Sequence, residues 1–381
     1  MGYTFCIFSA LFLPSTGGVE NYTFHLAETL SKNGYRIIIV TNNLFDLPPK
    51  EELDPLITIY RLPCFGLLNK RFPLPKPTKL FNGLLSELKS ESIDFVVINT
   101  RFYIHSLIAA KFADSKNITP ILIDHGSAYL TMNNKLLNCF IRIYEHFITS
   151  CLKRYHIKYY GVSKASSKWL KNFGITSHGE INNAIDINQF LNSSIEINNY
   201  RKKIGVKPQT TLVAFIGRLV EEKGINQLIR CASILQSENI LIAIAGDGPL
   251  LYELNSKQLS NIKLLGNISQ SEVSLLLSAA DIFCLPSRSE GFSTALLEAA
   301  AAKTAPIITN VGGVEELIPN NNYGIVLENQ EPSRIAEAIS YLNENPQETK
   351  AIGQNIFERV KSLYSWENTA QALISACKDA N

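Results

Sequence analysis

The stretch DIFCLPSRSEGFSTALLEAAA, residues 281–301, contains the pattern that decides the fold. It opens with a strand-like run, Asp281–Pro286, and from Thr294 onward its Ala- and Leu-rich composition favours a helix. Two glutamates, Glu290 and Glu298, stand eight residues apart in otherwise small or apolar surroundings. The stretch therefore predicts a strand–loop–helix junction that carries two carboxylates.

The same rhythm of a short apolar run, a polar turn and an amphipathic segment recurs along the chain. The predicted strands are residues 4–11, 36–41, 57–62, 95–99, 120–124 and 159–162 in the first half, and 211–217, 240–245, 262–265, 281–286, 305–309 and 324–326 in the second. Continuous apolar strands separated by helices are typical of parallel sheets covered on both faces. The predicted fold class is α/β, with two Rossmann-like, doubly wound parallel-sheet domains facing each other across a cleft.

The chain length favours two domains, because 381 residues exceed the usual span of one core. Residues 182–209 are rich in Asn and Ser and lack a long apolar periodicity, so the boundary is expected there. We expect a first domain at residues 1–185 and a second at residues 186–364. A C-terminal helix at about 365–381 is expected to pack back on the first domain.

Composition excludes several classes of protein. A hydrophobic fraction of 46% and a charged fraction of 18% describe a globular chain. The apolar start, Tyr3–Leu13, lacks a basic region and runs into a Gly-Gly turn, so it predicts a buried strand rather than a signal peptide. No window reaches the roughly 18–20 apolar residues of a membrane span. The seven cysteines show no paired short spacing, which indicates reduced thiols and a cytoplasmic location.

Charge is distributed unevenly. Residues 1–185 carry 20 Lys and Arg against 13 Asp and Glu, whereas residues 186–381 carry 16 against 21. Dense basic runs and nucleic-acid motifs are absent from the sequence, so a nucleic-acid partner is not expected. An anionic lipid surface and a phosphorylated acceptor remain open as partners of the first half.

The second half contains phosphate-type signals. In FIGRLVEEKG, residues 215–224, a strand ends at Gly217, and Arg218 and Lys223 follow on the loop. Two cations at the carboxyl end of a strand can neutralise a diphosphate, although two solvated surface cations are the alternative. The turn at Gly246 allows either close approach to a flat ligand or an ordinary chain reversal.

The loop and helix of the opening stretch offer an anion site. Gly291 permits an unusual backbone conformation, and the amides of Ser293 and Thr294 begin a helix whose positive end suits a phosphate. Glu290 would then be available to sugar hydroxyls and Glu298 to a ribose diol. The alternative is a helix with one glutamate as its cap and the other on its solvated face.

The first half offers weaker signals. Gly17 and Gly18 lie in a loop after the first strand, where either ligand packing or a plain strand–helix turn is expected. His125 ends a predicted strand and points into the cleft unless it is structural. Residues 135–160 have apolar residues at helical spacing and a net charge of +4, and residues 64–73 add an apolar and basic loop. The helix either lies in an anionic membrane interface or packs in the core with a basic outer face.

Together these residues resemble the retaining nucleotide-sugar glycosyltransferases of glycosyltransferase family 4, which have the GT-B fold. The sharpest element is the E-x7-E pattern, matched by Glu290 and Glu298. The Gly-Arg pair at 217–218 and the Glu-Lys-Gly triplet at 222–224 support it, and the resemblance spans nearly the whole chain.

The resemblance implies a role for each matching residue. Arg218 and Lys223 would stabilise the leaving diphosphate, Glu290 would hold the donor sugar and Glu298 the ribose. Amides near Ser293–Leu296 would bind the phosphates, His125 would contact the donor sugar, and Gly17 and Gly18 would line the acceptor side. The residues expected in catalysis are His125, Arg218, Lys223 and Glu290. Those expected in binding are Gly17, Gly18, Gly217, Gly246, Gly291, Phe292, Ser293, Thr294, Leu296 and Glu298.

The resemblance also implies a reaction. We expect a retaining transfer of a hexosyl or N-acetylhexosaminyl group from a UDP-sugar to a growing glycan, linked to polyprenyl diphosphate or lipid A core. Bacterial O-antigen, lipopolysaccharide or capsule synthesis is the expected setting, with peripheral attachment to the cytosolic face of the inner membrane. The nucleotide sugar is a co-substrate, no cofactor is expected, and the lack of an Asp-x-Asp triplet agrees with a metal-independent enzyme. A soluble sugar-phosphate acceptor and a non-catalytic nucleotide-sugar-binding scaffold are the alternatives.

Overall fold

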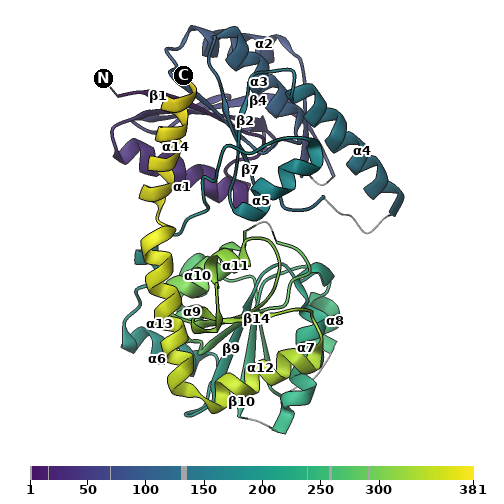
Figure 1. Cartoon of the computed structure of the whole chain (residues 1–381), viewed down its shortest axis with the longest axis vertical. Helices are drawn as coiled ribbons and strands as arrows, with labels where there is room; N and C mark the ends of the chain where they lie inside the picture. Colours follow the sequence, from purple (N-terminus) through teal and green to yellow (C-terminus); the bar gives the residue numbers. More distant parts are fainter. Residues whose placement is uncertain are drawn as a thin grey trace. The chain divides into compact units, whose positions relative to one another are not determined.

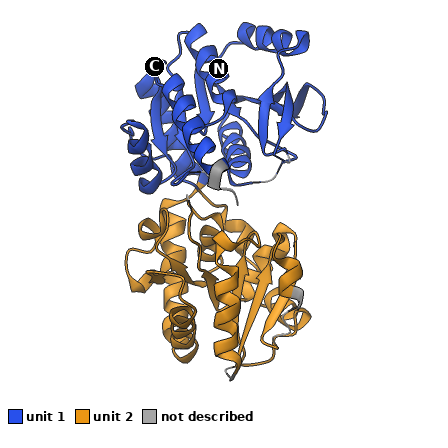
Figure 2. Cartoon of the chain, turned by 90° about the vertical axis from the view of Figure 1, so that its right-hand side faces the viewer, with its two compact units in different colours: residues 1–183, 366–381 blue, residues 184–365 orange. Residues whose placement is uncertain are grey.

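A computed structural model describes residues 2–15, 17–68, 70–129, 135–237, 239–256, 260–290 and 292–381. The chain divides into two compact units (Figure 2). Unit 1 comprises residues 1–183 and 366–381, and unit 2 comprises residues 184–365. In the described part of the chain, no helix is long and apolar enough to cross a bilayer.

Unit 1 is built around a largely parallel sheet. Its elements are β1 (Thr4–Ser9), α1 (Gly18–Lys32), β2 (Arg36–Asn43), β3 (Lys50–Asp54), β4 (Ile57–Leu67), β5 (Phe72–Pro75), α2 (Lys79–Ser90), β6 (Phe95–Asn99), α3 (Ile104–Ser115), β7 (Ile121–Asp124), α4 (Lys135–Leu152), β8 (Lys158–Gly161), α5 (Lys164–Trp169), η1 (Leu170–Phe173) and α14 (Trp366–Ala380). The strand order is β3-β4-β2-β1-β6-β7-β8, and β5 pairs with β4. Strands β3 and β5 each run antiparallel to β4, and the other pairs are parallel.

Unit 2 repeats this architecture with a parallel sheet. Its elements are η2 (Ile187–Phe190), α6 (Ser194–Lys203), β9 (Thr211–Ile216), η3 (Glu221–Lys223), α7 (Ile225–Ile234), η4 (Leu235–Ser237), β10 (Ile240–Ala245), α8 (Leu251–Ser256), β11 (Ile262–Gly266), α9 (Gln270–Ala279), β12 (Ile282–Leu285), α10 (Thr294–Ala301), β13 (Ala305–Thr309), α11 (Val314–Leu317), η5 (Asn321–Tyr323), β14 (Ile325–Leu327), α12 (Pro332–Glu344) and α13 (Pro346–Leu363). The strand order is β11-β10-β9-β12-β13-β14.

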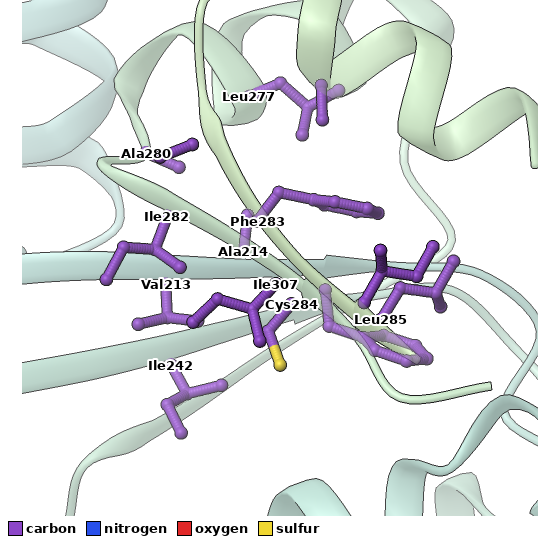
Figure 3. Close-up of a cluster of buried hydrophobic side chains, with 14 of the residues drawn as sticks. Val213, Ala214, Ile242, Leu277, Ala280, Ile282, Phe283, Cys284, Leu285 and Ile307 are labelled. Atoms are coloured by element: carbon purple, nitrogen blue, oxygen red, sulfur yellow. The ribbon is translucent and has the colours of Figure 1, made fainter. Parts of the chain in front are cut away.

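The core of unit 2 explains why β12 is a continuous apolar run. All four residues of β12 are buried. Phe283 lies on the same side of the strands as Leu277 of α9, while Cys284 points to the opposite side (Figure 3). A strand that is covered on both faces needs apolar side chains at every position, so it lacks a polar alternation.

The structure confirms the predicted fold class, two Rossmann-like parallel α/β sheets, and each predicted strand is present within a few residues of its expected bounds. Two strands were missed, β3 and β5, and the loop expected at residues 64–73 is in fact the end of β4 and the start of β5. Residues 182–209, where the domain boundary is expected, contain helix α6. The Ser193 and Glu196 side chains cap its first turn reciprocally.

The chain returns to unit 1 at its C-terminal end. Helix α14, yellow in Figure 1, packs beside α1. The rings of Tyr22 and Trp366 lie 5.5 Å apart in an edge contact, and Thr369 donates a hydrogen bond to the carbonyl oxygen of Asn182. These contacts hold residues 366–381 on unit 1.

One glycine fixes how α13 packs in unit 2. A Cβ atom at Gly353 would lie 2.1 Å from the carbonyl oxygen of Lys303, in the turn between α10 and β13. Gly353 therefore allows α13 to approach the turn that ends α10, the helix that carries Glu298.

We predict that Gly353→Ala lowers the free energy of unfolding of unit 2 by about 2–3 kcal/mol, because the methyl group overlaps backbone. Gly83→Ala is the matched control. Gly83 lies in α2 with open space around its Cβ position, so there the same change should stabilise the helix by about 0.5–1 kcal/mol. Urea unfolding of both variants measures the difference, and equal effects would contradict the packing argument.

Candidate active site

The strand order places the candidate donor residues at a topological switch point. In unit 2 the order reverses between β9 and β12, and ligands of doubly wound sheets bind where the carboxyl ends of such strands separate. The loop after β9 contains Arg218 and Lys223, and the loop after β12 contains Glu290. Three of the predicted catalytic residues therefore follow the two strands that flank the switch point.

Backbone contacts join these two loops. Gly224 has a φ of 73°, and a Cβ atom there would lie 1.9 Å from the carbonyl oxygen of Pro286. The amide of Arg288 donates to the carbonyl oxygen of Glu222 at 2.7 Å. Since a side chain at position 224 would collide with the β12 loop, the glycine of the Glu-Lys-Gly triplet is required for this close approach.

The contact brings Lys223 directly against Glu290. Lys223 Nζ lies 2.6 Å from Glu290 Oε1, and Ser287 Oγ donates to the same oxygen at 2.6 Å. The side chains of Lys223 and Glu290 are 22% and 9% exposed, so the pair is largely withdrawn from solvent. Arg218 is exposed on the β9 loop. The site thus has one cation paired with a carboxylate and a second cation at the surface.

Two predicted glycines contact each other. A Cβ atom at Gly246, which has a φ of 143°, would lie 1.9 Å from the carbonyl oxygen of Gly217. This close approach of the ends of β9 and β10 explains the glycine at position 246 by packing within the protein.

The predicted phosphate-binding turn is the start of α10. Ser293 caps the helix, and its Oγ accepts a hydrogen bond from the amide of Leu296 at 3.3 Å. The Leu296 amide is therefore already engaged by a side chain. Thr294 is exposed at the first helical position, and the ring of Phe292 packs against Tyr364 with centroids 5.3 Å apart. The prediction for Gly291 lies outside the described residues.

Glu298 lies one turn further along α10 and is half-buried. Burial raises its pKa to about 6, although a hydrogen bond from Gln270 Nε2, 3.0 Å from Glu298 Oε1, opposes this shift. The carboxylate is charged at neutral pH and gains a proton in mild acid.

In unit 1, His125 follows the last residue of β7. Its ring makes an edge contact with Tyr22 of α1 at 4.7 Å between centroids. Among the described residues, His125 Nε2 has no hydrogen-bond partner. Burial lowers the pKa of His125 to about 3, so the imidazole is neutral at physiological pH. A neutral ring can donate or accept a hydrogen bond to a ligand but supplies no charge.

The glycine pair of unit 1 lies at the start of α1. Gly17 is the N-cap in an extended conformation, and a Cβ atom there would lie 2.5 Å from Glu20 Oε2. Gly18 has open space at its Cβ position. Glu20 is 7% exposed, and burial raises its pKa. The sequence reasoning missed this carboxylate, although its place two residues after a glycine pair is a readable signal.

The structure thus brings together some of the predicted residues. Lys223 and Glu290 are in contact, and Ser293 binds Leu296 within the same turn. Gly17, Gly18 and His125 belong to unit 1, where Tyr22 links helix α1 to His125. Within the described ranges, no group of three or more His, Cys, Asp or Glu side chains is placed to hold a metal ion.

Comparison with known proteins identifies the family of the chain. A family model described as Glycosyltransferase Family 4 matches residues 16–189, and one described as Glycosyl transferases group 1 matches residues 196–359. The chain belongs to glycosyltransferase family 4. It is therefore a nucleotide-sugar glycosyltransferase, and a retaining mechanism is typical of its family.

Relatives extend over nearly the whole chain. The putative teichuronic acid biosynthesis glycosyltransferase TuaC of Bacillus subtilis is 25% identical over 89% of this chain and 84% of its own length. Anabaena HepE in complex with UDP-glucose has the same fold, with a TM-score of 0.76, 18% identity and 99% coverage of both chains. WaaG, a glycosyltransferase involved in lipopolysaccharide biosynthesis, has a TM-score of 0.69, 18% identity and coverage of 97% of this chain and 98% of its own.

The raised pKa of Glu298 predicts a pH-dependent cost to stability. A raised carboxyl pKa means that the folded state binds a proton more tightly than the unfolded state, so stability falls as pH rises from about 4.5 through about 6. Glu298→Gln does not titrate. The free energy of unfolding of this variant, relative to that of the wild type, should therefore rise by about 1–2 kcal/mol between pH 4 and pH 7.5. This range is discounted for the partial exposure of Glu298. Urea unfolding at both pH values measures this, and an unchanged difference would contradict it.

Proposed function

We propose that this glycosyltransferase transfers a sugar from a UDP-sugar to a lipid-linked glycan acceptor, with retention at the anomeric carbon. The observation that carries the proposal is the Lys223–Glu290 pair at the switch point of unit 2, where the loop of Lys223 also contains Arg218. A diphosphate and a sugar hydroxyl present the groups that these side chains recognise. The solved complex of the same fold with UDP-glucose supports UDP as the nucleotide.

In the proposed reaction, the bond between the anomeric carbon and the diphosphate oxygen breaks while the acceptor hydroxyl attacks from the same face, and the hydroxyl proton passes to the departing diphosphate oxygen. Negative charge develops on the departing diphosphate, and Arg218 and Lys223 stabilise it. Glu290 accepts hydrogen bonds from the donor sugar, Glu298 from the ribose, and amides at the start of α10 contact the phosphates. His125 contacts the donor sugar as a neutral imidazole. Rate enhancement comes from positioning and electrostatics, without a covalent nucleophile.

We assign the two units different substrates. Unit 2 contains most of the residues that would bind the donor, from Gly217 to Glu298, and His125 of unit 1 is the exception. Unit 1 would bind the acceptor, with Gly17 and Gly18 lining that side. The sugar transferred would be a hexosyl or N-acetylhexosaminyl group, and the setting bacterial surface-polysaccharide assembly, in line with the involvement of WaaG in lipopolysaccharide biosynthesis.

The two charged residues at the switch point give the direct test of the donor role. We predict that Lys223→Met and Glu290→Gln each cost about 2–4 kcal/mol of transition-state stabilisation, the usual effect of losing one preorganised electrostatic contact. UDP-sugar turnover at saturating acceptor measures kcat and KM for both variants.

The matched control is Arg334→Met, which removes one partner of the exposed Arg334–Glu337 pair in α12. It should leave turnover within about twofold, because exposed pairs contribute little. Near-normal turnover in both site variants would contradict the roles assigned to Lys223 and Glu290. Binding of a UDP-sugar without turnover in the wild type would instead favour the scaffold.

An exposed apolar surface on unit 1 supports a lipid-linked acceptor over a soluble sugar phosphate. Helix α4 buries Glu145, Ile148 and Leu152, whereas Phe140, Ile143 and Phe147, its apolar stripe, are 69%, 61% and 64% exposed. Side chains at this spacing share one face of a helix. The helix thus packs one face in the core and leaves a second apolar face uncovered within the described structure.

The tip of the β4–β5 hairpin also exposes apolar side chains on unit 1. Phe65, Leu67 and Leu68 are 52%, 46% and 46% exposed. The hairpin is joined to α4 through Phe72 and Tyr144, whose rings make an edge contact at 5.4 Å. Exposed cations accompany both parts: Lys70, Arg71 and Lys76 in the hairpin region and Arg142 on α4. Apolar side chains with adjacent cations complement an anionic lipid surface.

We predict that replacing Phe140, Ile143 and Phe147 with Ser weakens binding to anionic vesicles at least about tenfold. The reason is that three apolar side chains are no longer transferred from water into the lipid. Flotation with phosphatidylglycerol vesicles measures the effect. Leu191→Ser with Ile195→Ser is the control, since these side chains are 60% and 73% exposed in unit 2. Equal vesicle binding by the wild type and the α4 variant would exclude this surface and favour a soluble acceptor.

A further inference from the structure

Arg101 is a buried cation that the proposed chemistry does not use. It lies in the loop after β6, beside the switch point of the unit 1 sheet between β1 and β6, and is 2% exposed. Its guanidinium carbon lies 3.5 Å from the centre of the Phe173 ring. A fully desolvated arginine is costly unless each donor is satisfied, so the groups around it indicate what its position requires.

The guanidinium reaches acceptors on two separate elements. Arg101 Nε donates to Asp124 Oδ2 at 3.1 Å, at the end of β7. Nη2 donates to Glu145 Oε2 at 3.0 Å and Nη1 to Thr149 Oγ1 at 3.1 Å, both on α4. Thr149 in turn donates to the Glu145 carbonyl oxygen at 2.6 Å. One planar side chain therefore fixes the end of a strand relative to a helix.

The segment between these two anchors begins with His125. Asp124 immediately precedes His125, and Glu145 follows the segment on α4. Tyr129 adds a second attachment, because its hydroxyl lies 2.9 Å from His146 Nε2 of α4 and Arg142 stacks over its ring. Among the described residues His125 Nε2 has no hydrogen-bond partner, so the backbone next to Asp124 and the Tyr22 contact help to place the ring.

We propose that Arg101 is a positioning residue that joins the end of β7, next to His125, to α4 and thereby sets where the imidazole lies. The contacts of Arg101 with Asp124, Glu145 and Thr149 are called the clamp below. The importance of the clamp for catalysis rests on the proposed role of His125 at the donor sugar, but the clamp itself does not. A lysine at position 101 keeps the charge and reaches fewer acceptors, because it lacks the planar fork. The strand end and α4 would then lose their common anchor, and the His125 ring would shift.

Two variants and one matched control test the clamp. Arg101→Lys replaces the fork, and Thr149→Val removes one acceptor while keeping the shape of the side chain. Thr29→Val is the control, because Thr29 is also a buried helical threonine whose hydroxyl bonds the carbonyl four residues earlier, at 2.8 Å. Thr29 does not contact Arg101 or His125, so any effect common to the three variants reflects general destabilisation.

The direct readout is the NMR resonance of the His125 imidazole in protein labelled with ¹⁵N-histidine. The protein has six histidines, so the spectrum has few signals to resolve. His125→Gln identifies the signal. We expect Arg101→Lys and Thr149→Val to shift it and Thr29→Val to leave it in place. An unmoved resonance in both clamp variants, whatever their thermal stability, would overturn the proposal.

Kinetics supply the second readout. Misplacement of a group near the reacting centre should lower kcat about 10- to 100-fold, while the dissociation constant of UDP stays unchanged because its binding residues lie in unit 2. A shifted resonance with normal kcat would keep the clamp and overturn the role of His125 in the proposed function. Failure of the clamp and failure of the proposed role of His125 therefore give different results.

Discussion

The close approach of the β9 loop to the β12 loop is the constraint on which the donor half of the site depends. Gly224 packs against the carbonyl oxygen of Pro286, and the Arg288 amide bonds Glu222. Because position 224 lacks a side chain, Lys223 is carried to within 2.6 Å of Glu290. The geometry of the charged pair is thus set by backbone packing, which is stiffer than contacts between long side chains.

The ion pair of Lys223 with Glu290 lowers the free-energy cost of placing two charged groups in a largely buried site. Because we assign Lys223 to the diphosphate and Glu290 to the donor sugar, we infer that this ion pair opens when the diphosphate binds. Binding of the phosphates would then prepare the carboxylate that holds the sugar. A buried charged group also lies in unit 1, where Arg101 forms ion pairs with both Asp124 and Glu145.

The sequence predicted the parallel strands because each is a continuous apolar run, which is a local signal. It missed β3, whose residues Lys50–Asp54 are mostly charged and exposed, and β5, whose four residues include two prolines. Both are antiparallel additions at β4, where tertiary pairing overrides propensity. The contacts of the site could not be predicted either. Lys223 and Glu290 are 67 residues apart, and Arg101 joins partners up to 48 residues away.

The most direct measurement of the central claim is calorimetric titration of UDP into the wild type, Lys223→Met and Glu290→Gln. If Lys223 exchanges Glu290 for the diphosphate, Glu290→Gln should bind UDP at least as tightly as the wild type, because no ion pair must be broken. Lys223→Met should bind at least about tenfold more weakly, having lost a charge-assisted contact. An equal loss of affinity in both variants, or no loss in either, would contradict the exchange.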